Sequence, residues 1–266
     1  MHPGPQHGRR RGHSQPRLRF HIPSGRERKG RDKRHMKLII VRHAESGGNA
    51  EGRMQGHADF PLNDKGRAQA QKLREAFERE QLRPTHIYSS PLKRCAETTQ
   101  IALGYLSPLS VEYWDDLKEH DMGALSGLTV AEAAVKYPHI DFEAERLNAW
   151  NGVPGVETSD LRQARARRVV RTVLDCHEND ARVALVSHGG ITQYILGALM
   201  GTERAWGLAV ANTGVFEFAI DKPRWHSNGH DRRNPNNARI LRFNDARHLD
   251  GMSTAANADV GQTKKG

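Results

Sequence analysis

The stretch KLIIVRHAESGGN (residues 37–49) decides the fold, because a short apolar run ends abruptly in two basic residues. Residues 37–41 have the length and the β-branched content of a buried strand. Arg42 and His43 follow at once, and a glycine-containing polar segment comes after them. Taken alone, an arginine and a histidine after a strand are usually a solvated strand end, so their meaning depends on what the other strands carry at the same edge of the sheet.

Short apolar runs alternate with helical patterns through the rest of the chain. This alternation predicts an α/β fold, which we expect to be a three-layer sandwich with a mainly parallel central sheet and helices on both faces. Further strands are predicted over residues 85–90, 182–190, 214–220 and 238–245. The polar stretch over residues 221–237 is expected to be a long hairpin excursion. Helices are predicted over residues 64–80, 91–106, 128–138, 158–178 and 191–201.

The helix over residues 64–80 has the clearest amphipathic pattern. We expect it to begin at a cap formed by Asn63 or Asp64. Its predicted core face consists of Ala68, Leu73, Ala76 and Phe77.

Charge is distributed unevenly along the 266 residues, whose net charge is +10. Residues 1–35 carry eleven Lys/Arg and two Asp/Glu, so nearly all of the excess positive charge lies there. This segment has few apolar residues and many Pro, Gly and Arg, so we expect a disordered basic tail. Nonspecific contact with nucleic-acid phosphates is the interaction that such a tail would make. Translation starting at Met36 is an alternative that the compositional break leaves open.

The remaining composition bears on the class of protein and its compartment. No run approaches the roughly 18 apolar residues of a membrane span, and no apolar h-region marks a secretion signal. Cys95 and Cys176 are expected to be reduced thiols of a cytoplasmic protein. We expect one folded domain over residues 36–251 and a disordered C-terminal tail over residues 252–266. The sequence carries no signal of the oligomeric state.

Three predicted strands place functional side chains at one edge of the sheet. Ligands of open α/β sheets bind beyond the carboxyl ends of the strands. Arg42 and His43 end the first of these strands, and His188 ends another. Arg94 follows shortly after the strand over residues 85–90. We therefore expect two arginines and two histidines to converge at this edge.

Two guanidiniums and two imidazoles form a pocket for an anion. Phosphate fits best, because the planar arginine fork matches phosphate oxygens. Positive neighbours lower the pKa of a histidine, so that one imidazole stays neutral and nucleophilic. Such an imidazole in line with phosphorus forms a phosphohistidine, and no metal is required if the arginines neutralise the phosphate oxygens. The sequence thus predicts phosphoryl transfer with no metal or other cofactor.

Glu119, in the glycine-punctuated loop over residues 115–128, is the candidate for proton transfer. It would protonate the leaving alkoxide as a general acid and then activate water as a base. Its neighbours His120 and Asp121 are alternatives that composition leaves open. Each site residue alone also has an ordinary explanation, such as a solvated strand end or a surface charge. Only their shared placement at strand ends favours a common site.

Six segments in series resemble the phosphoglycerate-mutase-like proteins of the histidine phosphatase superfamily. The first, VRHAESGGN…RMQGHADFPLNDKGRAQA, resembles the Arg-His-Gly-Glu signature of that family. The others are SSPLKRCAETTQIA, LKEHDMGALSGLTVAEAAVKYP, PGVETSDLRQARARR, VALVSHGGIT and RFNDARHL. The resemblance implies a histidine phosphatase catalytic domain over residues 36–251.

The resemblance also implies roles for individual residues. His43 corresponds to the nucleophile that becomes phosphorylated, and Glu119 corresponds to the proton donor and acceptor. The phosphate clamp corresponds to Arg42, Arg94 and His188. The implied substrate-binding positions are Asn49, Gln55, Gly56 and Gly189.

The chain departs from the usual family pattern at three places. Ala44 stands where glycine is usual, and residues 155–158 read GVET in place of Gly-Gly-Glu-Ser. Gly48 stands where an aromatic residue is frequent, and we expect it to enlarge or loosen the site entrance.

The resemblance leaves a choice between phosphatase and mutase. Mutases of the family carry a longer segment between the glutamate and the second histidine, with an Arg-Arg element that binds substrate. Here the interval is short, and its only Arg-Arg pair, Arg167-Arg168, lies in a predicted helix. We therefore expect a metal-independent phosphomonoesterase of the broad-specificity or α-ribazole-phosphate-like sort, acting on small phosphorylated metabolites. The mutase is the alternative, and an inactive core with a nucleic-acid-binding tail is a third.

Overall fold

The computed structural model of the protein describes residues 35–142, 153–203, 207–225 and 237–252. The predicted basic tail and the predicted C-terminal tail lie outside these ranges, apart from residues 35 and 252. Residues 226–236 of the polar stretch also lie outside them. The expectations for these three segments therefore stay predictions.

Six strands form the central sheet: β1 (Met36–Arg42), β2 (His86–Ser89), β3 (Val111–Tyr113), β4 (Arg182–Ser187), β5 (Val215–Ile220) and β6 (Ala238–Asp245). Their order across the sheet is β3-β2-β4-β1-β5-β6. The first four in this order run parallel, and β5 is antiparallel to both β1 and β6. The prediction of a mainly parallel sheet is confirmed.

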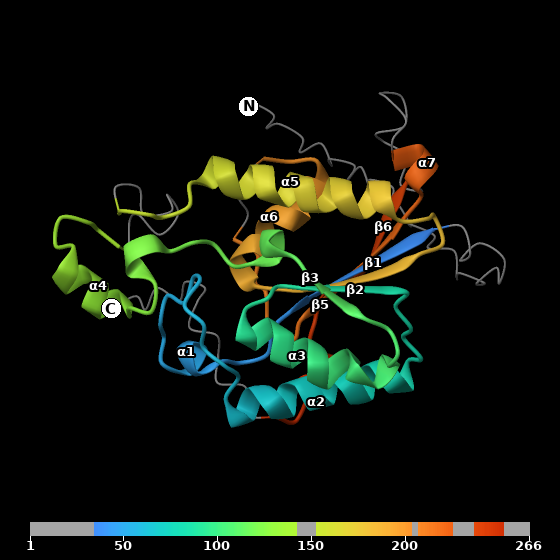
Figure 1. The fold of residues 1–266 in the computed structure, drawn as a ribbon, viewed down its shortest axis with the longest axis horizontal. Helices are drawn as coiled ribbons and strands as arrows, with labels where there is room; N and C mark the ends of the chain where they lie inside the picture. Colours follow the sequence, from blue (N-terminus) through green and yellow to red (C-terminus); the bar gives the residue numbers. More distant parts are fainter. Residues whose placement is uncertain (1–34, 143–152, 204–206, 226–236, 253–266) are drawn as a thin grey trace, which may run out of the picture. The chain divides into compact units, whose positions relative to one another are not determined.

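Helices cover both faces of the sheet (Figure 1): α2 (Asp64–Arg79) and α3 (Lys93–Leu103) on one, and α5 (Ser159–Cys176) and α6 (Gly189–Met200) on the other. Alternate side chains of β1 enter opposite layers. Leu38 and Ile40 pack with α5 and α6, whereas Ile39 and Val41 pack with α2 and α3. Burying such a side chain stabilises the fold by about 1.5–3 kcal/mol. The three-layer sandwich is confirmed, with β1 at its centre.

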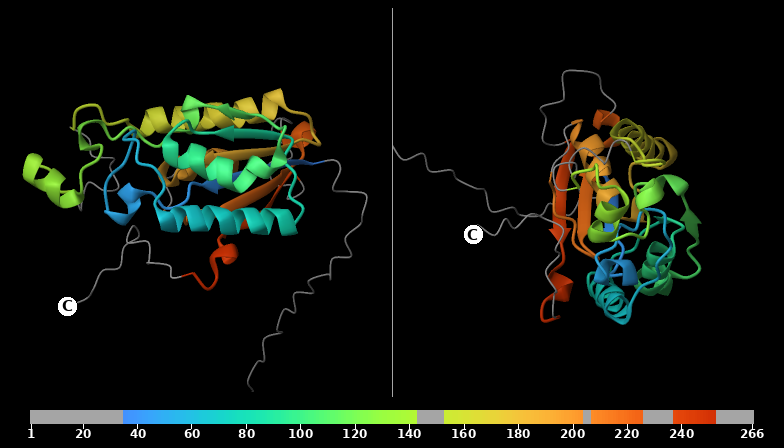
Figure 2. Two further views of the ribbon diagram at one scale, coloured as in Figure 1. Left: turned by 60° about the horizontal axis from the view of Figure 1, so that its bottom comes forward. Right: turned by 90° about the vertical axis from the view of Figure 1, so that its left-hand side faces the viewer.

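Shorter elements lie outside these layers: α1 (Gly47–Ala50), α4 (Val130–Lys136) and α7 (Lys222–Trp225). The α1 and α4 helices lie beyond the carboxyl end of β1, at the left of Figure 1. A 3₁₀ turn after β6 (Arg247–Leu249) lies beside α2 (Figure 2). No helix in the described ranges is long and apolar enough to cross a membrane.

The α2 helix begins where the sequence predicts. The Asn63 side chain caps it by accepting a hydrogen bond from the Gly66 N–H at 2.7 Å. Most of its predicted core face is buried, but Ala68 is exposed. Ala70 is buried in its place, because the buried face repeats at intervals of three and four residues and includes Ala70 and Leu73. The prediction for Ala68 was wrong.

The carboxyl ends of β2, β4 and β1 lie side by side at one edge of the sheet. Arg42 is paired with Ser187, and Ser89 with Val186, so the three strands end at the same level. The α6 helix begins at Gly189, two residues earlier than predicted and directly after His188. This edge is therefore where the predicted site residues leave the sheet.

Candidate active site

His43, Arg94 and His188 meet at the carboxyl edge of the sheet. The ring centroids of the two histidines are 5.0 Å apart. The Nε of Arg94 lies 3.1 Å from Nδ1 of His188. All three side chains are buried, and Arg94 is only 1% exposed. Three segments that are distant in sequence thus form one buried cluster.

His43 is held as a neutral imidazole with its lone pair on Nε2. Its Nδ1 lies 2.7 Å from the carbonyl oxygen of Ala44, and a carbonyl only accepts, so Nδ1 carries the proton. Burial, followed by the charges of Arg94 and Arg42, lowers the pKa of His43 well below its ordinary value. The sequence predicts this direction from the arginines alone, whereas burial is the larger cause. His43 therefore has an unprotonated nitrogen at neutral pH.

Arg94 is fixed by neutral acceptors. Its Nη1 donates to the carbonyl of Ala58 at 2.9 Å, its Nη2 to that of Gly56 at 2.8 Å, and its Nε to His188. These partners, the ones it has in the described part of the chain, carry no negative charge. A guanidinium has five N–H donors, so two of them are left for a ligand. Arg94 thus combines a rigid position with a positive charge that no hydrogen-bond partner neutralises.

His188 has a protein partner at each ring nitrogen. Its Nδ1 accepts from Arg94, and its Nε2 lies 2.8 Å from Oγ of Ser90. The thiol of Cys95 also lies 3.3 Å from this Nε2. Burial, followed by the charges of Arg94 and His43, lowers the pKa of His188 well below its ordinary value. In this arrangement the ring of His188 orients Arg94.

Arg42 lies against the first turn of α6. A Cβ atom at Gly189 would lie 3.3 Å from Nε of Arg42, so the glycine allows this close approach. The Nη1 of Arg42 donates to the carbonyl of Val210. A helix N-terminus carries partial positive charge. Arg42 and the start of α6 therefore present the same sign of charge at one place.

Glu119 is bound to the N-terminus of α6 through backbone amides. Its Oε1 accepts from the N–H groups of His120 and Ile191, and its Oε2 from that of Gly190, each at 2.9 Å. A Cβ atom at Gly190 would lie 2.6 Å from Oε1, so glycine makes room for the carboxylate. Burial raises the pKa of Glu119, but His120, the backbone amides of Gly190 and His120, and Arg94 outweigh burial and lower it overall. Glu119 is therefore ionised at neutral pH.

The two neighbours of Glu119 have different surroundings. Burial lowers the pKa of His120 to about 4, so its imidazole is neutral. Asp121 accepts from the N–H of Gly123 at 2.8 Å and lies 3.5 Å from Nδ1 of His57. His57, which sequence reasoning missed, also contacts the carbonyl of Glu119 at 3.0 Å. Of the three acid–base candidates, Glu119 is the one whose side chain is bonded to the start of α6.

The loop after β1 holds three of the four predicted substrate-binding residues, Asn49, Gln55 and Gly56, whereas Gly189 begins α6. Asn49 forms a capping box with Ser46, in which its side-chain oxygen Oδ1 accepts from the Ser46 N–H at 3.2 Å. Gln55 lies 2.7 Å from Oγ of Ser46. A Cβ atom at Gly48 would lie 2.7 Å from the Gln55 side chain, so Gln55 fills the space that we expected to be open. Gly56, at a φ of 50°, contributes its carbonyl to Arg94.

A second group that sequence reasoning missed fixes the backbone of His43. Asn212 donates from Nδ2 to the His43 carbonyl at 2.9 Å, and the N–H of Thr213 donates to the Arg42 carbonyl at 3.1 Å. Thr213 has a φ of 55°, which is unusual for a β-branched residue. Its Oγ1 lies 2.8 Å from Nε2 of His248. No local pattern marks these residues, because the Asn212–His43 contact spans 169 positions.

The site as a whole offers a neutral imidazole, fixed positive charge and a carboxylate at one edge of the sheet. These are the groups that covalent phosphoryl transfer through a histidine requires. Within the described ranges, no three His, Cys, Asp or Glu side chains are grouped so as to hold a metal ion.

Comparison with known proteins identifies the family. Residues 38–231 match the model of the histidine phosphatase superfamily (branch 1). Phosphoglycerate mutase-like protein 4 of Arabidopsis thaliana is 34% identical over 200 residues, which cover 72% of this chain and 83% of that protein. The metal-independent phosphoserine phosphatase of Arabidopsis thaliana is 32% identical over 189 residues, which cover 70% and 77%. The structure of YhfR from Bacillus stearothermophilus matches 80% of this chain and 99% of its own, at 25% identity and a TM-score of 0.67. The chain belongs to the histidine phosphatase superfamily.

Proposed function

We propose that the protein is a metal-independent phosphomonoesterase that hydrolyses small phosphorylated metabolites through a phosphohistidine at His43. The observation that carries this proposal is the buried, neutral His43 beside Arg94, whose charge the neighbouring side chains do not neutralise. Family membership supports it, because two-step transfer through histidine is the general mechanism of the family. We also propose a cytoplasmic location, which the free thiols of Cys95 and Cys176 support.

In the first step Nε2 of His43 attacks phosphorus, and the bond from phosphorus to the ester oxygen breaks. The two remaining N–H groups of Arg94, together with Arg42, stabilise the negative charge on the phosphoryl oxygens. These guanidiniums take the place of a metal ion. The ester oxygen leaves with a proton from Glu119, which forms a free alcohol.

Proton donation requires a change in the state of Glu119, since its pKa is lowered and the group is ionised at neutral pH. A phosphate ester brings negative charge next to the carboxylate, and a like charge raises a carboxyl pKa. We therefore propose that Glu119 takes up its proton as the substrate binds. In the second step water attacks the phosphohistidine, and Glu119 accepts a proton from that water. The bond between phosphorus and nitrogen then breaks, which releases phosphate and restores neutral His43.

The surroundings of the Arg-Arg pair support hydrolysis over mutase activity. Arg167 is exposed on α5 and forms an ion pair with Glu203 at 2.8 Å. Arg168 is also exposed and binds Asp116 through two hydrogen bonds of 2.7 Å. Both guanidiniums thus have acidic surface partners, and neither is held ready for a second substrate.

A quenched single turnover with a ³²P-labelled phosphomonoester tests the phosphohistidine. With a chelator present, we expect an acid-labile, base-stable label on the wild-type protein. His43→Ala should carry no label, whereas His139→Ala, which changes an exposed histidine, should label normally. Turnover by the wild type without any label, or turnover that a chelator abolishes, would contradict the proposal.

Incubation with 3-phosphoglycerate and its bisphosphate separates the two activities. We expect release of inorganic phosphate. Exchange between the 2- and 3-phosphate isomers without phosphate release would contradict the phosphatase proposal and identify the activity as that of a mutase.

A further inference from the structure

Thr213 holds a backbone conformation that β-branched residues rarely adopt. Its φ of 55° lies in the left-handed region, where the branched side chain crowds the main chain. The residue is fully buried and lies just before the strand β5. A strained residue persists only where surrounding contacts hold it, and such residues cluster at functional sites. The contacts of Thr213 therefore show what its strained backbone serves.

The strained backbone directs hydrogen-bond donors at the main chain of the proposed nucleophile. The N–H of Thr213 donates to the carbonyl of Arg42 at 3.1 Å and to that of His43 at 3.4 Å. The side chain of Asn212 donates to the same His43 carbonyl at 2.9 Å. On its other side, His43 donates its own N–H to the carbonyl of Ser187 at 2.9 Å. The peptide groups on both sides of His43 are therefore fixed.

His248 holds the side chain of Thr213. The Thr213 hydroxyl donates its one proton to the carbonyl of Asn212 at 2.7 Å. The Nε2 of His248 lies 2.8 Å from the same hydroxyl oxygen, so it must be the donor in this contact. Burial lowers the pKa of His248, and the neutral ring thus carries its only proton on Nε2. Hydrogen bonds therefore run from His248 through Thr213 and Asn212 to the carbonyl of His43.

His248 belongs to a different part of the fold from the site. It lies on the 3₁₀ turn after β6, which packs beside α2 (Figure 2). That turn carries none of the residues proposed for binding or chemistry at the carboxyl edge of the sheet. Among the described residues, Thr213 is the hydrogen-bond partner of His248. An effect of His248 on the site is therefore transmitted through Thr213.

The phosphate would be held by different contacts. Arg94, the main charge proposed to bind it, is fixed by the carbonyls of Gly56 and Ala58 and by His188. None of these partners belongs to the series of hydrogen bonds that begins at His248. Loss of that series would displace the nucleophile relative to phosphorus and leave the phosphate where it is. In-line attack is sensitive to such a change, because a misplacement of about 1 Å costs roughly 100-fold in rate.

We propose that His248 is a positioning residue for phosphoryl transfer, whose hydrogen bond to Thr213 maintains the strained backbone that fixes the main chain of His43. This inference rests on the proposed phosphatase function. We therefore expect His248 to determine the rate of the first chemical step but not the affinity for phosphate. A residue that merely stabilises the fold would change the amount of active protein and leave both of these quantities as they are.

A single turnover of a ³²P-labelled phosphomonoester, with the protein in excess, measures the rate constant of ester cleavage. Competition by inorganic phosphate measures the affinity for phosphate. For His248→Ala we expect the rate constant to fall by about 10- to 100-fold and the inhibition by phosphate to stay unchanged. His248→Gln should recover most of the rate, because its amide keeps an N–H donor for the Thr213 oxygen.

Changes at Thr213 test the same contact from its other side. Thr213→Val, which removes the hydroxyl and keeps the branched shape, should be as slow as His248→Ala. The double variant should be no slower than either single variant, since both changes break one contact. If His248→Ala does not fold, as judged by urea unfolding, Thr213→Val and Thr213→Ser provide the comparison, because only serine keeps the hydroxyl.

Arg247→Met is the matched control. Arg247 lies on the same 3₁₀ turn as His248, and its ion pair with Asp245 does not involve Thr213. This variant should cleave the ester at the wild-type rate, so a slow Arg247→Met would attribute the effect to the turn as a whole and overturn the role of His248.

Three further results would overturn the positioning role. The first is a folded His248→Ala variant that cleaves the ester as fast as the wild type. The second is a loss that His248→Gln does not reverse, and the third is a loss accompanied by equally weakened inhibition by phosphate. The proposed phosphatase function would survive each of them, because it requires only that the wild type is labelled at His43. A wild type that cleaves the ester without any label would contradict the phosphohistidine and the positioning role with it.

Discussion

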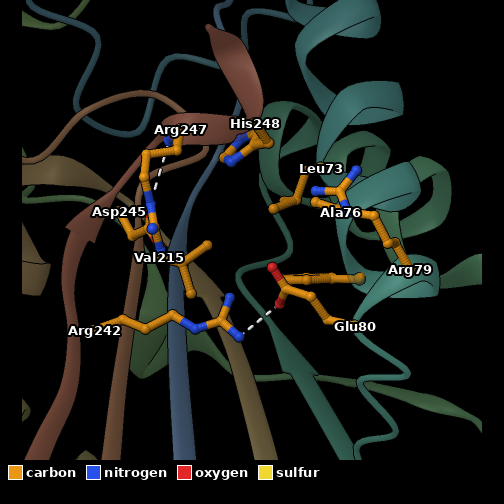
Figure 3. Close-up of a pocket in the computed structure, with 10 residues that line it drawn as sticks. Leu73, Ala76, Arg79, Glu80, Val215, Arg242, Asp245, Arg247 and His248 are labelled. Atoms are coloured by element: carbon orange, nitrogen blue, oxygen red, sulfur yellow. Dashed lines mark hydrogen bonds and ion pairs between the residues drawn. The ribbon is translucent and has the colours of Figure 1, made fainter.

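Two regions of the molecule gather arginine side chains, and they differ in how the positive charge is balanced. In the candidate active site Arg94 is buried, and its hydrogen-bond partners are two backbone carbonyls and the imidazole of His188. A cavity of about 220 Å³ between α2 and the β5–β6 pair contains a second group of arginines. There Arg242 approaches Glu80 at 2.5 Å (Figure 3).

The same cavity contains a second ion pair, between an arginine and an aspartate of the protein itself. Arg247 binds Asp245 at 2.6 Å and lowers the pKa of this carboxyl to about 2 (Figure 3). Arg242 reaches a further acid, Glu217, at 2.9 Å. The cavity thus carries acids that match these arginines, and such ion pairs, which solvent still reaches, contribute roughly 0–1 kcal/mol each to stability.

Whether an acidic partner is present distinguishes arginines that stabilise the fold from arginines that can bind an anionic ligand. A paired guanidinium has its counter-charge in the protein and gains little from an anion. A buried guanidinium surrounded by neutral acceptors gains its counter-charge only when a ligand arrives. Removal of the charge should therefore affect activity in the first region and, slightly, stability in the second.

Arg94→Met provides the largest expected effect. It removes the fixed charge and donors beside His43, so kcat/KM for p-nitrophenyl phosphate should fall by about 10³-fold or more. Arg242→Met, the matched change in the cavity, should leave kcat/KM unchanged and lower the free energy of unfolding by about 1 kcal/mol or less. Steady-state kinetics and urea unfolding of both variants measure these effects. Comparable losses of activity in the two variants would remove the distinction between the regions.

Glu119→Gln provides the next largest effect. With an alkyl phosphate, whose leaving oxygen needs a proton, kcat should fall by roughly 10²- to 10⁴-fold. The wild type needs neutral His43 and protonated Glu119. Its activity should therefore fall at low pH, where His43 becomes protonated, and at high pH, where Glu119 loses its proton. Because substrate raises the pKa of Glu119, the alkaline limb of kcat should lie at higher pH than that of kcat/KM. The variant should lack this limb, and a limb that persists in it would assign proton transfer to another group.

Stability should respond to pH through the buried neutral histidines. The pKa values of His43, His188 and His120 are lowered in the folded protein, so the unfolded chain binds more protons below pH 6.5. The free energy of unfolding should therefore decrease as the pH falls below 6.5, by up to about 1.4 kcal/mol per pH unit for each histidine. For His120, whose pKa is about 4, the loss amounts to roughly 3 kcal/mol in all. Urea unfolding of the wild type and His120→Asn between pH 7 and 4 measures this share, which the variant should lack.

Deletion of residues 1–35 provides the smallest expected effect. The charge of that segment is not part of either arginine group, so phosphatase turnover should be nearly intact. Any affinity for nucleic acid should disappear with the segment and weaken steeply with salt. A loss of turnover greater than about tenfold, or 1.4 kcal/mol in the barrier, would contradict this expectation.

The parts of the fold that the sequence predicts well depend on local signals. Buried strands such as β1 and β4 are short apolar runs, and the functional residues follow them directly, so the carboxyl edge can be located without coordinates. The edge strand β3 could not be predicted in this way, because Glu112 and Tyr113 are exposed and carry no buried pattern. The buried face of α2 also differs from the predicted one at one position. Ala68 and Ala70 are both small and apolar, so the helical periodicity alone does not decide which of them faces the core.

The parts of the site that could not be predicted depend on contacts between distant segments. The Glu119 carboxylate accepts hydrogen bonds from the amides of Gly190 and Ile191, which lie more than seventy positions away. The contact between Asn212 and the His43 carbonyl likewise spans 169 positions. The sequence shows which residue types are present in these segments, but it does not indicate which of them come into contact in the folded protein.

Arg165 links the position of α5 to the loop that carries Glu119. Its guanidinium donates to the carbonyls of Asp116, Lys118 and Glu119, so any shift of the helix would displace the proposed proton donor. An engineer who changes side chains on α5 should therefore keep Arg165 and leave the helix where it is.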